Sequence, residues 1–187
     1  MRTFIAVDLT SEIKRRIADL VHRLKFAAPR GIGWANIADL HVTLKFLGEI
    51  GEATLPDIQK AVSKAASSAP SFPLSVYGTG TFPPGSRRPR VLWVGLRESP
   101  PLLDLHGRIE NLMTGLGFPA EERAFRPHLT IGRVKSWPVT QALIGRLDEY
   151  RETLFGDLSV REVAVYHSVL HPQGAEHTIL FREALRP

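Results

Sequence analysis

The sequence contains no cysteine and no long apolar run. Without cysteine, the chain has no disulfide bonds, no thiolate nucleophile and no cysteine-based zinc site. No stretch approaches the ~18 consecutive apolar residues that a membrane-spanning helix requires. The apolar run that follows Met1 is interrupted by Asp8, which makes it too short for a signal peptide. We therefore expect a cytoplasmic protein that does not enter a membrane.

The composition is that of an ordinary globular protein, with 43% hydrophobic and 23% charged residues. A length of 187 residues predicts one domain over residues 1–187, formed by two similar lobes that share one core. The formal net charge of +5 favours an anionic partner such as a phosphate-bearing substrate. Most basic residues are arginine, which suits bidentate phosphate binding, although genomic base composition produces the same bias.

A His-x-Thr tripeptide followed by an aliphatic residue occurs twice, as His-Val-Thr-Leu at 41–44 and His-Leu-Thr-Ile at 128–131. Apolar and polar residues alternate in both copies, which predicts two β-strands. Alternation places the histidine and threonine of each copy on one face of its strand and the aliphatic residues on the other. Two imidazoles and two hydroxyls presented by two strands are the groups that acid–base chemistry on a phosphodiester needs.

Apolar periodicity and turn residues predict further helices and strands along the chain. A first helix is expected to begin at Thr10 or Ser11 and to end before Pro29. The other predicted helices cover 55–66, 102–113 and 140–154, and the other predicted strands cover 2–7, 72–77, 90–96, 163–170 and 177–181. Residues 78–89, rich in glycine, proline and arginine, are predicted to form a loop.

The two halves of the sequence follow the same order, with a helix, a His-x-Thr strand, a helix and further strands. This repeat predicts an α+β fold, a two-lobed pseudo-two-fold duplication of mainly antiparallel sheets with outer helices. The two motif strands are expected to face each other across a central active-site groove.

Five segments of the sequence resemble those of a known family. They are Arg-Thr-Phe-Ile-Ala-Val (2–7), His-Val-Thr-Leu-Lys-Phe-Leu-Gly-Glu (41–49), Gly-Thr-Phe-Pro (80–83), Phe-Arg-Pro-His-Leu-Thr-Ile-Gly-Arg (125–133) and Ser-Val-Leu (168–170). The chain resembles the 2H phosphoesterase superfamily and, within it, the RNA 2′,3′-cyclic phosphodiesterases, historically called 2′–5′ RNA ligases. His167 and His177 depart from the family pattern, which has a small polar residue and an aromatic residue, typically tyrosine, at these positions.

Hydrolysis of a cyclic phosphodiester needs a base for water and an acid for the leaving alkoxide. Histidine serves in both roles because its ordinary pKa is about 6.5. Thr43 and Thr130 would bind the two non-bridging phosphate oxygens, and Arg133 would contact the phosphate or the neighbouring nucleotide. The scheme uses no cofactor and no metal, and two histidines without a third ligand make a poor metal site.

The resemblance implies metal-independent hydrolysis of the 2′,3′-cyclic phosphodiester ends of RNA or oligonucleotides to a 2′-phosphomonoester. It also implies that His41 is the acid that protonates the leaving 3′ oxygen and that His128 is the base that activates water. The spacing of the residues alone fits the exchanged roles equally well. A 2′–5′ ligase activity could be the same site run backwards, although excess water favours hydrolysis. We expect a monomer.

Other residues near the motifs have a functional and a structural interpretation. Arg126, Phe82 and Trp93 could bind RNA, the two aromatic residues by stacking on a base, or could be ordinary surface and core residues. Phe46, three residues after Thr43, is predicted to face the core. Three arginines, Arg87, Arg88 and Arg90, could form a basic lip for RNA or an ordinary solvated loop. His22 and His106 are predicted to lie at the surface or at its boundary. His167, His171 and His177 lie around the turn of the last hairpin, and the positions of His167 and His177 could touch substrate.

Three alternatives stay open at this point. A different 2H enzyme would act on small cyclic nucleotides or on ADP-ribose cyclic phosphate, and a substrate panel would distinguish it. An RNA-binding module without chemistry would explain the basic charge but not the threonine partner of each histidine. In an unrelated fold, the two motifs would be coincidental core strands.

Both histidines are expected to be essential if they act as the acid and the base. His41→Ala and His128→Ala should each lower turnover by about 10²- to 10⁴-fold, because each removes one of two proton transfers. The pH–rate profile of the unsubstituted enzyme should be bell-shaped. Steady-state hydrolysis of a 2′,3′-cyclic phosphate measures both effects, and a variant that retains the full rate would contradict the prediction.

Overall fold

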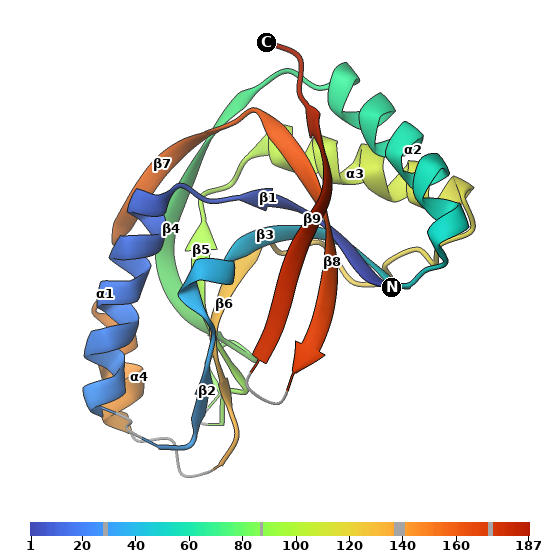
Figure 1. Cartoon of the computed structure of the whole chain (residues 1–187). Coiled ribbons are helices and arrows are strands. Elements are labelled where there is room, and N and C mark those ends of the chain that lie inside the picture. The colour runs from blue at the N-terminus through green and yellow to red at the C-terminus, as the bar shows by residue number, and fades with distance from the viewer. Residues whose placement is uncertain (28–29, 87, 137–140, 172–173) are drawn as a thin grey trace.

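The computed structural model describes residues 1–27, 30–86, 88–136, 141–171 and 174–187, and its strands form two antiparallel sheets (Figure 1). Sheet 1 has the order β3–β1–β8–β9, with the bounds His41–Glu49, Arg2–Asp8, Glu162–His171 and Gly174–Ala184. Sheet 2 has the order β2–β6–β5–β4–β7, with the bounds Ile32–Trp34, His128–Val134, Val91–Leu96, Phe72–Phe82 and Leu154–Val160. The two motif strands, β3 and β6, contact each other where the sheets meet.

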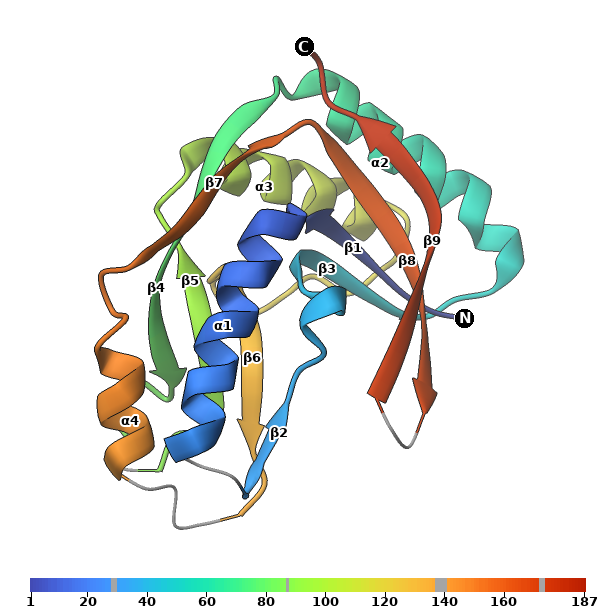
Figure 2. The same cartoon turned by 60° about the vertical axis from the view of Figure 1, so that its left-hand side comes forward.

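Two pairs of α-helices cover the outer faces of the sheets (Figure 2). Helices α1 (Ser11–Ala27) and α4 (Gln141–Asp148) pack on each other and on sheet 2. Helices α2 (Leu55–Ser68) and α3 (Pro100–Gly115) pack on each other and on sheet 1. Short 3₁₀-helices, η1 (Ile37–Asp39) and η2 (Glu52–Thr54), flank β3. The predicted two-lobed α+β fold with mainly antiparallel sheets and outer helices is confirmed.

Helix α1 shows how the sequence specifies these elements. The Thr10 hydroxyl accepts a hydrogen bond from the Ile13 N–H at 3.3 Å and caps the first turn. Apolar residues recur at helical spacing along the helix and form one stripe, and all of them are buried, namely Ile13, Ile17, Leu20, Val21 and Leu24. The stripe belongs to a core cluster that also contains Ile5 of sheet 1 and Val94 of sheet 2. The two sheets therefore share one continuous hydrophobic core.

The lobes do not coincide with the two halves of the sequence. Sheet 1 combines β1 and β3 with the hairpin β8–β9, whereas sheet 2 contains β2 and the strands from β4 to β7. Helix α1 follows β1 in the sequence but packs on sheet 2. Strand pairing explains this arrangement, because β1 pairs with β3 on one side and with β8 on the other. The late hairpin therefore returns to the first strand.

Some boundaries differ from the predictions. Residues 78–82, predicted as part of a loop, continue β4, because residues 79–82 pair with β5. Gly78 lies at the bulge before them and adopts a left-handed φ of +75°. The helix predicted over 140–154 is shorter, since Leu154 begins β7, whose alternation one bulge interrupts. The predicted start of that helix, Thr140, lies outside the described residues.

One extra residue interrupts each motif strand directly after its threonine. It is Leu44 in β3 and Ile131 in β6, because the residues on either side of it pair with consecutive positions of β1 and β5. Beyond such a bulge, the two faces of a strand exchange places. Lys45 is therefore buried and Phe46 is 65% exposed, so the prediction that Phe46 faces the core is wrong. Arg133, at the equivalent place in β6, is exposed as well.

Candidate active site

A cleft of about 1710 Å³ opens where the two motif strands meet. It contains all the residues predicted for the site, namely His41, Thr43, His128, Thr130 and Arg133. Phe46, turned outward by the bulge in β3, lines the same cleft. The fold thus brings both motifs to one place, as the predicted central groove requires, and the chemical roles of the individual residues stay predictions.

The two histidines are held in the same way. The Nδ1 atom of His41 lies 2.7 Å from the carbonyl oxygen of Asp39 in η1. The Nδ1 atom of His128 lies 2.7 Å from the carbonyl oxygen of Arg126, in the loop before β6. Because a carbonyl oxygen only accepts hydrogen bonds, Nδ1 carries the proton in both rings. Each neutral imidazole therefore keeps Nε2 as a proton acceptor, and each becomes a donor there when it is protonated.

The surroundings of the two rings differ. His41 is stacked on Phe4 at a centroid distance of 4.5 Å and also lies near Tyr166 and His177, at 5.7 and 5.4 Å. Burial lowers the pKa of His41 to about 4, against the opposing effect of the hydrogen bond to the Asp39 carbonyl. In the unliganded protein, His41 is therefore neutral at neutral pH.

A buried polar contact fixes the aromatic stack behind His41. Tyr166 lies parallel to Phe4, with the ring centroids 5.0 Å apart, and its hydroxyl donates a hydrogen bond to the carboxylate of Asp8. Arg182 pairs with the same carboxylate at 3.0 Å. Burial, followed by the hydrogen bond to Asp8, raises the pKa of Tyr166 above its ordinary value. Tyr166 therefore stays protonated and keeps donating to Asp8.

His177, predicted to begin the last strand beside a turn, is a site residue. The pairing of His177 with Ser168 in the hairpin β8–β9 sets its ring edge-on to both Phe4 and His41, at 5.0 and 5.4 Å. Burial lowers its pKa, and its buried Nδ1 has no hydrogen-bond partner among the described residues. The sequence signal was the departure at this position, where the family has an aromatic residue.

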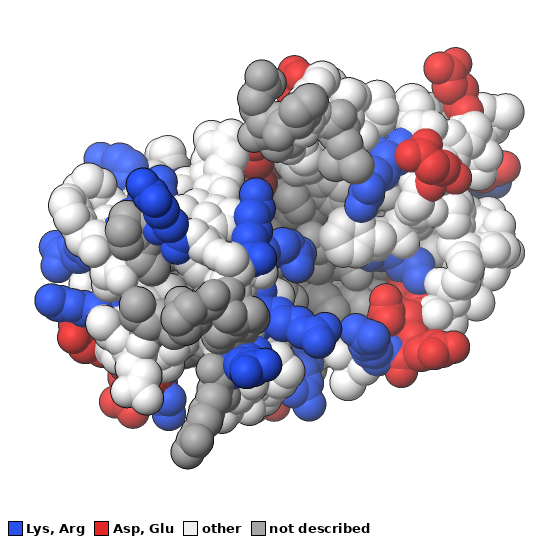
Figure 3. All heavy atoms as spheres, turned by 90° about the horizontal axis from the view of Figure 1, so that it is seen from below, with Lys and Arg blue, Asp and Glu red and all other residues white. Residues whose placement is uncertain are grey.

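Basic side chains surround the cleft. Lys and Arg side chains gather around a hollow on the face of the molecule in Figure 3. The exposed basic residues that line the cleft are Lys25, Arg90, Arg123, Arg126 and Arg133. Of the three arginines that could form a basic lip or a solvated loop, Arg90 lines the cleft and Arg88 is exposed away from the lining, while Arg87 lies outside the described residues. This charge favours the approach of a polyanion.

Several aromatic rings also reach the cleft. Phe46 and Phe82 line it, and Phe82 lies edge-on to His128 at 5.0 Å. Trp93 lies next to Phe82, with a centroid distance of 5.5 Å, and is not part of the lining. His106, predicted to lie on the surface, lines the cleft and stacks on Phe125 at 3.8 Å. The cleft thus offers apolar ring surface next to cationic groups.

The described residues were searched for metal-binding clusters and for membrane-spanning helices. Within the described ranges, three or more histidine, aspartate or glutamate side chains do not gather anywhere in a way that could hold a metal ion. None of the helices there combines the length and the apolar character that crossing a membrane requires.

Comparison with known proteins assigns the family. Residues 9–171 match the model of the 2′-5′ RNA ligase superfamily. The chain belongs to this superfamily. The RNA 2′,3′-cyclic phosphodiesterase of Thermotoga maritima is 34% identical to it over 97% of this chain and 94% of its own length. The RNA 2′,3′-cyclic phosphodiesterase of Archaeoglobus fulgidus is 35% identical over 93% of this chain and 94% of its own length.

Solved structures of similar proteins have the same fold. The structure of TT0787 of Thermus thermophilus covers 100% of this chain and 98% of its own, with a TM-score of 0.81 and 31% identity. The structure of E. coli LigT complexed with 3′-AMP covers 98% of this chain and 97% of its own, with a TM-score of 0.75 and 28% identity. The predicted family and enzyme class, a hydrolase acting on phosphodiesters, are confirmed. An unrelated fold and a binding module without chemistry are excluded.

The pKa of His41 is expected to be measurable as a low midpoint in an NMR titration of its ring. The resonance should titrate near pH 4, because burial opposes protonation. Between this pH and about 6.5, the unfolded chain binds a proton that the folded protein does not. The free energy of unfolding should therefore decrease as the pH falls through this window. His41→Phe should remove that part of the pH dependence, whereas a midpoint near 6.5 would contradict the prediction.

Proposed function

We propose that the protein hydrolyses the 2′,3′-cyclic phosphodiester ends of RNA to 2′-phosphomonoesters, with His41 and His128 as acid and base and without a metal ion. The observation that carries this proposal is the matched support of the two imidazoles, each with Nδ1 2.7 Å from a backbone carbonyl and with its ring at a shared cleft. The names of the relatives from T. maritima and A. fulgidus support the same substrate class.

Two proton transfers at Nε2 complete the reaction. His128 takes a proton from water while the water oxygen forms a bond to phosphorus. The bond between phosphorus and the 3′ oxygen breaks, and protonated His41 donates its Nε2 proton to that oxygen. The products are a 3′-hydroxyl and a 2′-phosphate, and exchange of protons with solvent restores both histidines. If a 5′-hydroxyl attacks in place of water, the same steps form a 2′–5′ linkage.

The acid role of His41 depends on the bound substrate. In the free protein, the pKa of His41 is lowered to about 4, so the ring carries no proton to donate at neutral pH. A negatively charged phosphate beside the ring favours the protonated form, and the carboxylate of Asp8 acts in the same direction. Substrate binding therefore favours the protonated form of His41, which is the form that can act as the acid. The exchanged order of roles would instead use neutral His41 as the base.

Three further side chains bind the phosphate in this scheme. Thr43 and Thr130 lie two residues after the histidines on the cleft side of their strands and donate their hydroxyls to the non-bridging oxygens. Arg133, brought to the cleft by the bulge in β6, adds a charged donor. These donors stabilise the negative charge that grows on the phosphoryl oxygens as water attacks.

The size and lining of the cleft favour RNA ends over small cyclic nucleotides. A cleft of about 1710 Å³ is much larger than one cyclic phosphate needs. Phe46 and Phe82 offer ring faces for nucleobases, and Arg90 and Arg126 offer cations for backbone phosphates. An oligonucleotide uses all of these groups, whereas a mononucleotide uses few of them.

An oligonucleotide that ends in a 2′,3′-cyclic phosphate is expected to give a 2′-phosphate as the product, in the presence of a metal chelator. Phosphorus NMR of the product identifies the position of the phosphate. The kcat/KM for the corresponding cyclic mononucleotide should be lower by a factor of about ten or more, because this substrate lacks the stacking and phosphate contacts. A 3′-phosphate, or no reaction of either substrate, would refute the proposal.

The order of the two roles is expected to appear in a substrate whose leaving 3′ oxygen is replaced by sulfur. A thiolate leaves without protonation, so the variant that lacks the acid should recover and the variant that lacks the base should not. We expect His41→Ala to regain most of its lost rate with this substrate and His128→Ala to stay inactive. Recovery of His128→Ala alone would establish the exchanged order.

A further inference from the structure

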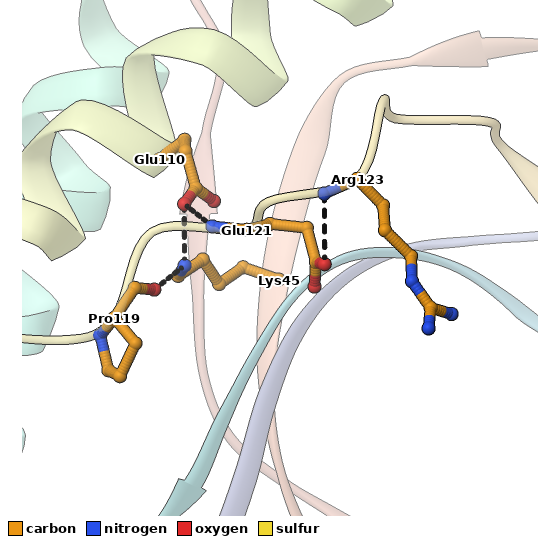
Figure 4. A network of polar contacts seen from close by, with 5 residues as sticks. All are labelled: Lys45, Glu110, Pro119, Glu121 and Arg123. Carbon is orange, nitrogen blue, oxygen red and sulfur yellow. Dashed lines mark hydrogen bonds and ion pairs between the residues drawn. The ribbon is translucent and has the colours of Figure 1, made fainter.

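The buried cation of Lys45 takes no part in the proposed reaction. Its side chain is 5% exposed, and the bulge in β3 takes it out of the alternation that places His41 and Thr43 on one face. Lys45 is nevertheless among the residues that line the cleft, together with Glu110 and Glu121. Its Nζ atom donates to the Glu110 carboxylate of α3 and to the Pro119 carbonyl, both at 2.7 Å (Figure 4). Burying a charged pair costs free energy, and an apolar pair of similar size often gives the folded protein the same stability. Stability alone therefore does not explain why this position holds a charged pair.

Both members of the pair hold the backbone of one segment, the linking loop (residues 116–127) between α3 and β6. Lys45 donates to the Pro119 carbonyl, and the same Oε1 atom of Glu110 that pairs with Lys45 accepts a hydrogen bond from the Glu121 N–H at 2.8 Å. Burial raises the pKa of Glu110, but these hydrogen bonds and the charge of Lys45 outweigh it and lower the pKa below its ordinary value. Glu110 is therefore an anion that binds the loop.

The linking loop ends at the second motif. Phe125 stacks on His106 of α3 with a centroid distance of 3.8 Å and an angle of 6° between the rings. The next residue, Arg126, supplies the carbonyl oxygen that holds Nδ1 of His128. Arg123, Phe125 and Arg126 also line the cleft. The position of the loop thus sets the orientation of His128 and one wall of the cleft.

We propose that the Lys45–Glu110 pair is a positioning element that ties the strand of the first motif to the loop that orients His128. Lys45 follows Thr43 by two residues in the first motif, and its contacts lead through Glu110 and the linking loop to the histidine of the second motif. The two motifs belong to different sheets, and these contacts fix their positions relative to each other. This inference rests on the proposed function for its effect on rate but not for its effect on the ring of His128.

The test separates positioning from stability with three variants. Lys45→Met and Glu110→Leu each leave an unpaired buried charge and should lower Tm by about 10 °C. The double variant removes both charges and should regain most of that loss. Each single variant lacks one of the two contacts to the loop, and the double variant lacks both. We therefore expect kcat/KM, measured well below Tm, to stay reduced about 10- to 100-fold in each, with no recovery in the double variant. Glu110→Gln, which keeps an acceptor oxygen for Lys45 and Glu121, should lose less rate than Glu110→Leu.

Nitrogen-15 NMR of the histidine rings provides a readout that does not depend on activity. In the double variant, His128 should lose its preference for the tautomer with the proton on Nδ1, while His41, held by η1, should keep it. Asp104→Asn, which breaks an exposed ion pair with Arg108 on the same helix, serves as the matched control and should change neither ring.

Two outcomes would overturn the inference. The first is a double variant that regains both the stability and the kcat/KM of the unsubstituted protein. The second is an unchanged tautomer of His128 in that variant. If the unsubstituted protein does not hydrolyse cyclic phosphates at all, the proposed function fails, and the tautomer measurement still decides whether the pair positions His128.

Discussion

The extra residue after each threonine is the constraint on which the site depends. An uninterrupted β3 would place Lys45 on the same face as His41 and Thr43 and would place Phe46 on the opposite face, because side chains alternate between the two faces of a strand. The bulge at Leu44 reverses this, so that the cleft face continues from His41 and Thr43 to Phe46. The bulge in β6 does the same for Arg133. In each strand the bulge thus replaces the residue two positions after the threonine, Lys45 or Gly132, by the residue three positions after it, Phe46 or Arg133.

The two histidines have the same backbone support but different neighbours. Phe4, Tyr166 and His177 surround His41, and burial among them lowers its pKa. His128 instead has Phe82 at its edge. A duplicated motif therefore becomes chemically unequal through packing, by residues that lie outside the motif itself. In the proposed reaction, this inequality distinguishes the ring that donates a proton from the ring that accepts one.

Patterns local in sequence predicted much of this molecule, and contacts between distant segments account for what they missed. The motif strands and the apolar stripe of α1 are visible because they repeat over a few residues. The environment of Phe46 could not be predicted from the sequence, because the bulge depends on the pairing of β3 with β1 rather than on the sequence of β3. The contacts of His177 were not visible either, because its neighbours Phe4 and His41 come from strands that are far away in the sequence. Each sheet interleaves strands from distant parts of the sequence, and this interleaving could not be predicted for the same reason.

That interleaving also fixes when the site can mature during synthesis. Both motifs and the strands of sheet 2 emerge from the ribosome before the hairpin β8–β9, which carries Tyr166 and His177. Until the hairpin docks, one edge of β1 has unpaired backbone groups and is open to pairing with other chains. Phe4 and His41 lack their aromatic cover over the same interval. The burial that lowers the pKa of His41 is therefore complete only when these two strands are in place.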